Sequence, residues 1–116
     1  MDYLDFDFSE DEHGTGTWDA MASVHAERVP ALAAEVEQVL QWAHPEFPGR
    51  QGPIEEGYDW DYDLQSQDDD GHPLPARFDT DSCKLLLPAS DTGRTTVCLS
   101  LAGSAQFGAA LTVWLS

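Results

Sequence analysis

The sequence lacks asparagine, has a single lysine (Lys84) and two cysteines, and contains no long apolar run. No run approaches the roughly 18 apolar residues that a membrane-spanning helix needs, so we expect no membrane partner. Residues 1–5 carry acids where a signal peptide carries bases, which predicts a cytoplasmic protein with reduced thiols. Two separated cysteines are too few soft ligands for a structural metal site, and no cofactor is predicted.

Basic residues are also scarce. Five Lys and Arg face 22 Asp and Glu among 116 residues, which gives a formal net charge of −17. A surface of this sign repels DNA, RNA and anionic lipid, because these are polyanions themselves. The same surface attracts cations and basic proteins. We therefore expect no nucleic acid partner and favour a basic protein.

The acids are concentrated in two segments. Residues 1–12 contain six acids and residues 55–70 contain eight, with no base in either segment, whereas residues 92–116 contain no acid. No linker-like run of Gly, Ser and Pro divides the chain, and its length is typical of one domain. We therefore expect a single domain over 1–116 that carries its charge mainly on two segments.

Local patterns predict a hairpin followed by a helix. Apolar and polar residues alternate over 3–9 and again over 17–24, with glycines between the two runs, which is typical of a β-hairpin. Apolar residues then recur at helical spacing from about residue 26 to about residue 43. Pro30 is tolerated in a first helical turn, and the prolines from Pro45 onward are expected to end the helix.

The rest of the chain predicts four strands. Aromatic residues alternate with aspartates over 58–64, and a strand near 76–87 changes parity at 80–83, which predicts a bulge or a switch of face there. Two strands, 94–102 and 106–115, close the chain. The predicted fold is α+β: an antiparallel β-sheet of about six strands in the order ββαββββ, with one amphipathic helix packed on one face.

Strand parity also makes predictions about the cysteines and the sheet surface. If Leu85 and Leu87 share a buried face with Val97, then Cys83 faces the core and Cys98 the opposite side, so both thiols stay free. One helix covers only part of such a sheet. The weakly polar far face would be covered by the connection after the helix, by sheet curvature or by a second subunit of a homodimer. Its residues are Cys98, Ser100, Ala102, Ala110, Thr112 and Trp114.

The candidate binding residues are the aspartates that alternate with aromatic residues. In two strands with their rings turned inward, these aspartates form outward rows, and the rows merge into one carboxylate field if the strands are neighbours. A turn after the second row adds three more acids. The candidates are Asp5, Asp7, Asp59, Asp61, Asp63, Asp68, Asp69 and Asp70.

The segment that begins at Asp59 has the D-x-D-x-D spacing of a calcium-binding loop. Such a loop has glycine at its sixth position because the chain turns sharply there, and this sequence has Leu64. An extended strand holds carboxylates on one side about 7 Å apart, too far for three of them to reach one ion. No metal site is therefore predicted. The turn 68–70 is expected to be a charged turn, with loose cation binding as the alternative.

These features favour a non-catalytic protein-binding module that receives a basic partner, as acidic inhibitors of basic toxins and mimics of nucleic acid do. The alternative is an accessory domain whose acidity reflects its host and which dimerises through its sheet. A row of acids that is merely solvated also explains the pattern. An enzyme would need a cleft that holds a histidine and a buried carboxylate together.

Overall fold

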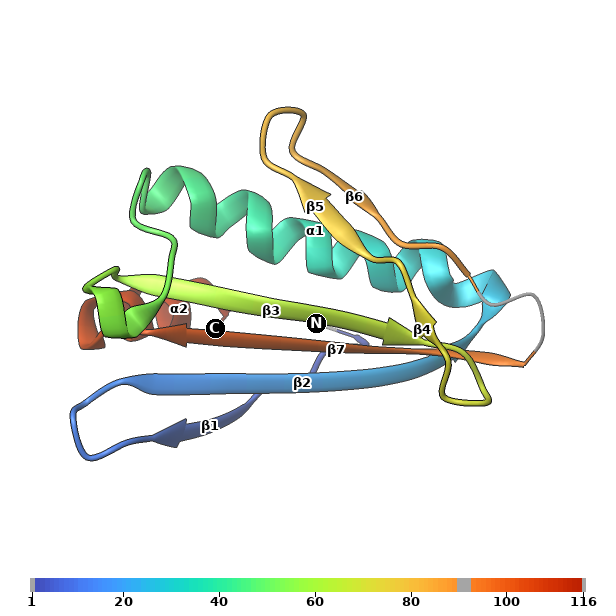
Figure 1. Ribbon diagram of the computed structural model, residues 1–116, viewed down its shortest axis with the longest axis horizontal. Helices are drawn as coiled ribbons and strands as arrows, with labels where there is room; N and C mark the ends of the chain where they lie inside the picture. The colour runs from blue at the N-terminus through green and yellow to red at the C-terminus, as the bar shows by residue number, and fades with distance from the viewer. Residues whose placement is uncertain (1, 90–92, 116) are drawn as a thin grey trace.

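The chain forms an α+β fold in which two helices pack on one face of an antiparallel sheet (Figure 1). The structure is a computed structural model and describes residues 2–89 and 93–115. Five strands form the main sheet in the order β1-β2-β7-β3-β4, and two more form a separate small sheet. The elements are β1 Asp7–Glu10, β2 Gly16–His25, η1 Ala26–Arg28, α1 Val29–Glu46, η2 Ile54–Glu56, β3 Trp60–Gln67, β4 Pro73–Leu74, β5 Arg77–Asp79, β6 Lys84–Leu86, β7 Arg94–Gly103 and α2 Ala105–Leu115.

Strands β2, β7 and β3 form the centre of the sheet, and their alternate residues are buried. On β7, Val97, Leu99 and Leu101 are fully buried on one side of the strand, as the parity of the sequence predicts. Their neighbours on the other side of the strand face away from the helices and are partly exposed. Burying each of these side chains contributes about 1.5–3 kcal/mol relative to leaving it in water. The two long strands thus confirm the predicted spans 17–24 and 94–102 to within a residue.

Helix α1 buries the predicted apolar line, but it ends later than expected. Its buried residues include Leu32, Val36 and Leu40, and a 3-10 turn precedes it. Pro45 was expected to stop the helix near residue 43, and this prediction is wrong: the helix runs to Glu46. Proline removes only its own N–H, and in the last turn the backbone N–H of Phe47 still bonds to the Ala43 carbonyl at 3.0 Å.

The last segment is a helix, α2, and the predicted strand 106–115 is wrong. Ser104 caps it: the N–H of Phe107 donates to Ser104 Oγ at 3.2 Å, and the N–H of Gly108 donates to its carbonyl. Phe107 and Leu111, four residues apart, are both fully buried. The apolar residues of this short segment fit both the period of a strand and the period of a helix. Tertiary packing selects the helix. The expected weakly polar sheet face therefore lacks Ala110, Thr112 and Trp114.

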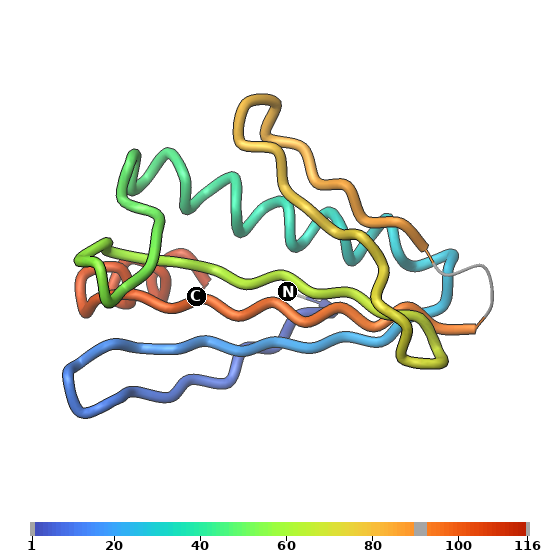
Figure 2. The backbone as a smooth tube through the Cα atoms, viewed as in Figure 1, coloured from blue at the N-terminus to red at the C-terminus, as the bar shows by residue number. Residues whose placement is uncertain are grey.

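The predicted strand 76–87 is also wrong as a single element. The positions expected to bulge form a turn, in which Cys83 has a positive φ of 57°, and the flanking strands β5 and β6 pair with each other. This hairpin lies over α1 (Figure 2). The N–H of Leu85 donates to Glu37 of the helix, and the Gln41 amide donates to the Cys83 carbonyl. Cys83 is exposed rather than core-facing, whereas both thiols are free, as predicted.

The first strand and the third differ from their predicted bounds. Residues 3–6 do not join the sheet, because Glu35 of α1 accepts the backbone N–H groups of Asp2, Tyr3 and Leu4 at 2.9–3.1 Å. This carboxylate holds the chain against the helix, where Leu4 is buried. Strand β3 starts two residues later than expected and continues to Gln67. Residues 90–92, which precede β7, lie outside the described residues.

Candidate acidic binding surface

The two acidic strands are not neighbours, because β2 and β7 lie between β1 and β3. Within the described sheet, the carboxylate rows of β1 and β3 therefore do not merge into the single field expected for neighbouring strands. The register instead brings carboxylates together on one face across four strands. Asp7 lies opposite Asp19, Asp19 opposite Ser100, and Ser100 opposite Asp63. This row crosses three strand spacings, about 14 Å.

The row lies on the face of the sheet that no described helix covers. Alternation along β2 buries Trp18 and Ala20 beneath the helices and therefore turns Asp19 outward, where it is exposed. The same alternation turns Asp61 and Asp63 outward on β3, opposite Ala102 and Ser100. We call Asp5, Asp7, Asp19, Asp61 and Asp63 the acidic face. Asp19 was not among the residues predicted from the sequence, although its alternation with the apolar residues Trp18 and Ala20 was a sufficient signal.

Small side chains of β7 form the floor between the carboxylates. A hollow of about 470 Å³ on one side is lined by Asp5, Asp7 and Asp19 together with Cys98 and Ser100. A second hollow of about 140 Å³ lies on the other side of Ser100, and Asp61, Asp63 and Ala102 contribute to it. The hydroxyl of Ser100 donates a short hydrogen bond to Asp19 Oδ1. Long side chains of a partner can therefore reach between the acids.

Hydrogen bonds orient part of the acidic face, but no described cation neutralises it. Asp61 Oδ1 accepts from the Gln51 amide at 2.6 Å, and Asp63 accepts from Gln65 at 2.9 Å. None of the five carboxylates forms an ion pair with another described residue. Burial, and secondarily the charge of Asp61, raises the pKa of the Tyr62 hydroxyl. The acidic face thus carries charge that the described part of the chain does not balance.

Asp59 stands apart from this surface, although the sequence grouped it with Asp61 and Asp63. Arg50 binds it with two hydrogen bonds, from Nε to Oδ2 at 2.7 Å and from the terminal nitrogen to Oδ1 at 3.2 Å. This hydrogen bond and the charge of Arg50 hold the pKa of Asp59 below its ordinary value. Asp59 is therefore already paired within the chain.

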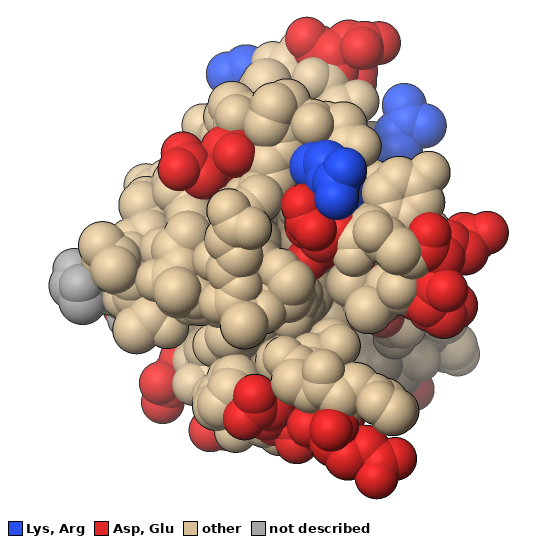
Figure 3. Space-filling view, turned by 90° about the vertical axis from the view of Figure 1, so that its left-hand side faces the viewer, with Lys and Arg blue, Asp and Glu red and all other residues tan. Residues whose placement is uncertain are grey.

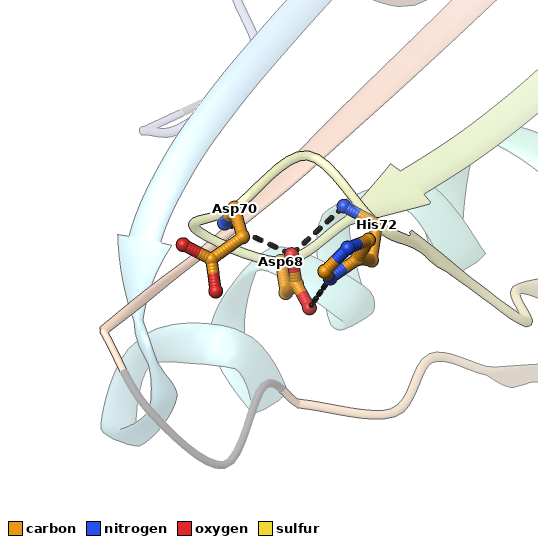
Figure 4. Close-up of side chains that lie close together, drawn as sticks. All are labelled: Asp68, Asp70 and His72. Atoms are coloured by element: carbon orange, nitrogen blue, oxygen red, sulfur yellow. Dashed lines mark hydrogen bonds and ion pairs between the residues drawn. The ribbon is translucent and has the colours of Figure 1, made fainter.

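The turn 68–70 lies at the β3–β4 connection and is held by its own hydrogen bonds. Asp68 Oδ1 accepts the N–H groups of Asp70 and His72, both at 2.9 Å, and these bonds lower the pKa of Asp68 (Figure 4). Asp69 packs against Gly93, where an added Cβ would lie 2.8 Å from the Asp69 Cγ.

The ligand atoms of Asp68, Asp70 and His72 lie within 4.8 Å of one another, with the His72 ring 3.4 Å from Asp68. The turn geometry accounts for their proximity without an ion. The predicted charged turn therefore explains the arrangement.

Most of the aromatic residues belong to the core rather than to the acidic face. Trp60 is fully buried and stacks on Phe107 at 5.5 Å, and His44 stacks on Phe78 at 5.4 Å. Burial lowers the pKa of His44, whose Nε2 is buried without a hydrogen-bond partner among the described residues. Phe8 is the exception among the strand aromatics, since 58% of it is exposed.

No helix among the described residues is both long and apolar enough to cross a membrane. Comparison with protein-family models, with curated proteins and with solved structures gives no match.

Proposed function

We propose that this protein is a small, non-catalytic, acidic binding module whose acidic face receives the basic surface of a partner protein. The observation that carries the proposal is the register of the sheet, which gathers carboxylates from β1, β2 and β3 on the uncovered face. These carboxylates have no described cation to balance them. A cytoplasmic location is part of the proposal, since both cysteines are free thiols, as is usual in reducing compartments.

The shape of the acidic face supports contact with Lys or Arg side chains. The carboxylates of Asp7, Asp19 and Asp63 flank a floor of small residues, so a long basic side chain reaches them without a clash. Charge complementarity of this kind mainly raises the association rate, by about 10- to 1000-fold in steered complexes. Such binding weakens as salt screens the charges beyond about 10 Å at 0.1 M ionic strength.

A matched pair of triple variants tests the proposal. Asp7→Asn, Asp19→Asn and Asp63→Asn together remove three charges from the acidic face. Glu55→Gln, Glu56→Gln and Asp81→Asn remove three exposed charges elsewhere. Both proteins are used as bait beside the wild type in a low-salt lysate, and the dissociation constant of each captured basic protein is then measured against salt.

We expect the first triple variant to lose the basic prey and the second to retain it, with wild-type affinity falling as salt rises. Affinity that does not change with ionic strength would count against the proposal. Equal losses in both variants would instead favour the second candidate, an accessory domain whose acidity reflects its host. The exposed acids at η2 and in the β5–β6 turn favour that candidate, because they lie on elements that do not form the acidic face.

A further inference from the structure

Strand β1 is a free edge of the main sheet. It pairs with β2 on one side and has no strand on the other side within the described chain. All four of its residues are exposed. A free edge presents unpaired N–H and C=O groups, to which another extended chain can bond.

The hairpin register identifies the groups that face outward. The N–H of Asp11 donates to the Thr15 carbonyl at 2.9 Å, so residues 11 and 15 form a hydrogen-bonded pair. Hydrogen-bonded and non-hydrogen-bonded pairs alternate along an antiparallel ladder. The backbone groups of Ser9 and Asp7 therefore also bond toward β2. The backbone N–H and C=O groups of Phe8 and Glu10 therefore point away from β2, toward the open edge.

The two sides of this edge differ in chemistry. On the uncovered face, Asp7 lies beside Asp5 and Asp19 in the larger hollow of the acidic face. On the helix side, Phe8 lies over Trp18 with ring centroids 5.0 Å apart, next to a groove of about 510 Å³ between the hairpin and α2. Figure 3 shows this end of the molecule, with acids along its lower edge below a broad uncharged area.

Two glycines shape the groove. A Cβ at Gly108 of α2 would lie 2.7 Å from Cη2 of Trp18, and a Cβ at Gly16 would lie 2.8 Å from Cε1 of Phe8. These distances are shorter than a non-bonded contact of a Cβ atom. The two rings therefore lie directly on the backbone of the two glycines. Apart from Glu10 at its rim, the groove is lined by apolar side chains, glycines and one threonine. It therefore suits an apolar side chain.

We propose that an extended segment of the basic partner adds to the edge of β1 as a further strand. Its alternate side chains then point to opposite faces of the sheet. Lys or Arg side chains reach the acidic face at Asp5, Asp7 and Asp19, and the intervening apolar side chains lie against Phe8 and the groove. This inference rests on the proposed function, because it takes the partner to be basic, and it adds the binding mode and the sequence pattern of the partner.

Charge disfavours a second copy of this chain at the same edge. Pairing two β1 edges would place two strands that each carry Asp7 and Glu10 side by side, in two molecules that each carry a net charge of −17. Like charges across a strand pair are destabilising. The same charges are complementary to a basic segment.

Synthetic peptides test the binding mode on the intact protein. The first peptide alternates lysine and valine, so that all its lysines point to one side of a strand. The second has the same composition with lysines and valines in two blocks. The two peptides have equal charge, but only the first matches both sides of β1. We expect the first to bind at least about tenfold more tightly, a difference of about 1.4 kcal/mol.

Amide hydrogen exchange supplies a readout that attraction to the acidic face alone would not change. With the alternating peptide at about 100 times its dissociation constant, exchange at Phe8 and Glu10 should slow by about 100-fold. The amides of Asp7 and Ser9 already bond to β2, so their change should be smaller. Asp7→Asn should weaken the alternating peptide, and Glu55→Gln is the matched control.

Each alternative result has a defined meaning. Equal binding of both peptides without slower exchange at Phe8 and Glu10 would overturn strand addition and leave the proposed function standing. Binding of neither peptide would also overturn strand addition, while the lysate experiment would still decide the proposed function. Slow exchange at both amides in the free protein, together with a doubled mass in solution, would identify a second copy as the occupant and overturn the inference.

Discussion

The two segments in which aromatic residues alternate with aspartates have similar sequences but different surroundings. Trp60 of β3 is fully buried under the helices, whereas Phe8 of β1 is 58% exposed. Strand β3 lies between β7 and β4, and β1 lies at the sheet edge. The acids differ as well, because side-chain amides bind Asp61 and Asp63, whereas no such bond to Asp7 occurs among the described residues. The same local pattern therefore gives a core strand or an exposed edge according to its place in the sheet.

The largest expected effect distinguishes the two aromatic residues. Trp60→Ala removes a fully buried ring that stacks on Phe107 and should lower the free energy of unfolding by about 3–5 kcal/mol. Phe8→Ala should lower it by about 1 kcal/mol or less, because the ring is mostly exposed. Urea denaturation of both variants measures the difference. Equal losses would show that β1 is as strongly integrated into the core as β3.

A second expected effect concerns the attachment of the first segment to α1. Glu35→Ala leaves the N–H groups of Asp2, Tyr3 and Leu4 without their acceptor and should cost about 1–3 kcal/mol. Limited proteolysis should then cut before β1 sooner than in the wild type. Glu27→Ala, at an exposed acid of η1, is the control and should leave the rate of cutting unchanged.

A third expected effect is a pH dependence that comes from the core beneath β3. Burial lowers the pKa of His44 in the folded state, so the unfolded chain binds a proton first as pH falls. The free energy of unfolding should therefore decrease as pH drops below about 6.5, down to the lower folded pKa. His44→Phe should flatten this part of the stability profile. His13→Phe, at an exposed turn, should leave it unchanged, and a profile that rises on acidification would contradict the assignment.

The smallest expected effect concerns the paired acid that precedes β3. Arg50→Gln removes the guanidinium that holds the pKa of Asp59 down, and this pKa should rise toward its ordinary value. An NMR titration of the Asp59 carboxyl measures the change. Arg77→Gln is the control, because the pKa of Asp59 does not depend on Arg77. An unchanged Asp59 titration in Arg50→Gln would mean that the pair is open in solution and that Asp59 belongs with the free carboxylates.

Local periodicity and composition were enough to predict several features of the fold. Alternation of apolar and polar residues identified β2 and β7, and helical spacing of apolar residues identified the buried side of α1. The charge and its concentration in two segments can be read directly from the residues. These features were predictable because each pattern reports which side of one element faces the core.

Which elements meet depends on packing between distant parts of the chain, and local patterns do not show it. The short segment from Ala105 to Leu115 fits two periods, and its packing around Phe107 selects the helix. Strand order separates β1 from β3, and register then aligns Asp7, Asp19 and Asp63 on one face. Strand partners are chosen by contacts between residues far apart in the chain, so a local pattern gives each strand its buried side but does not give it its neighbour.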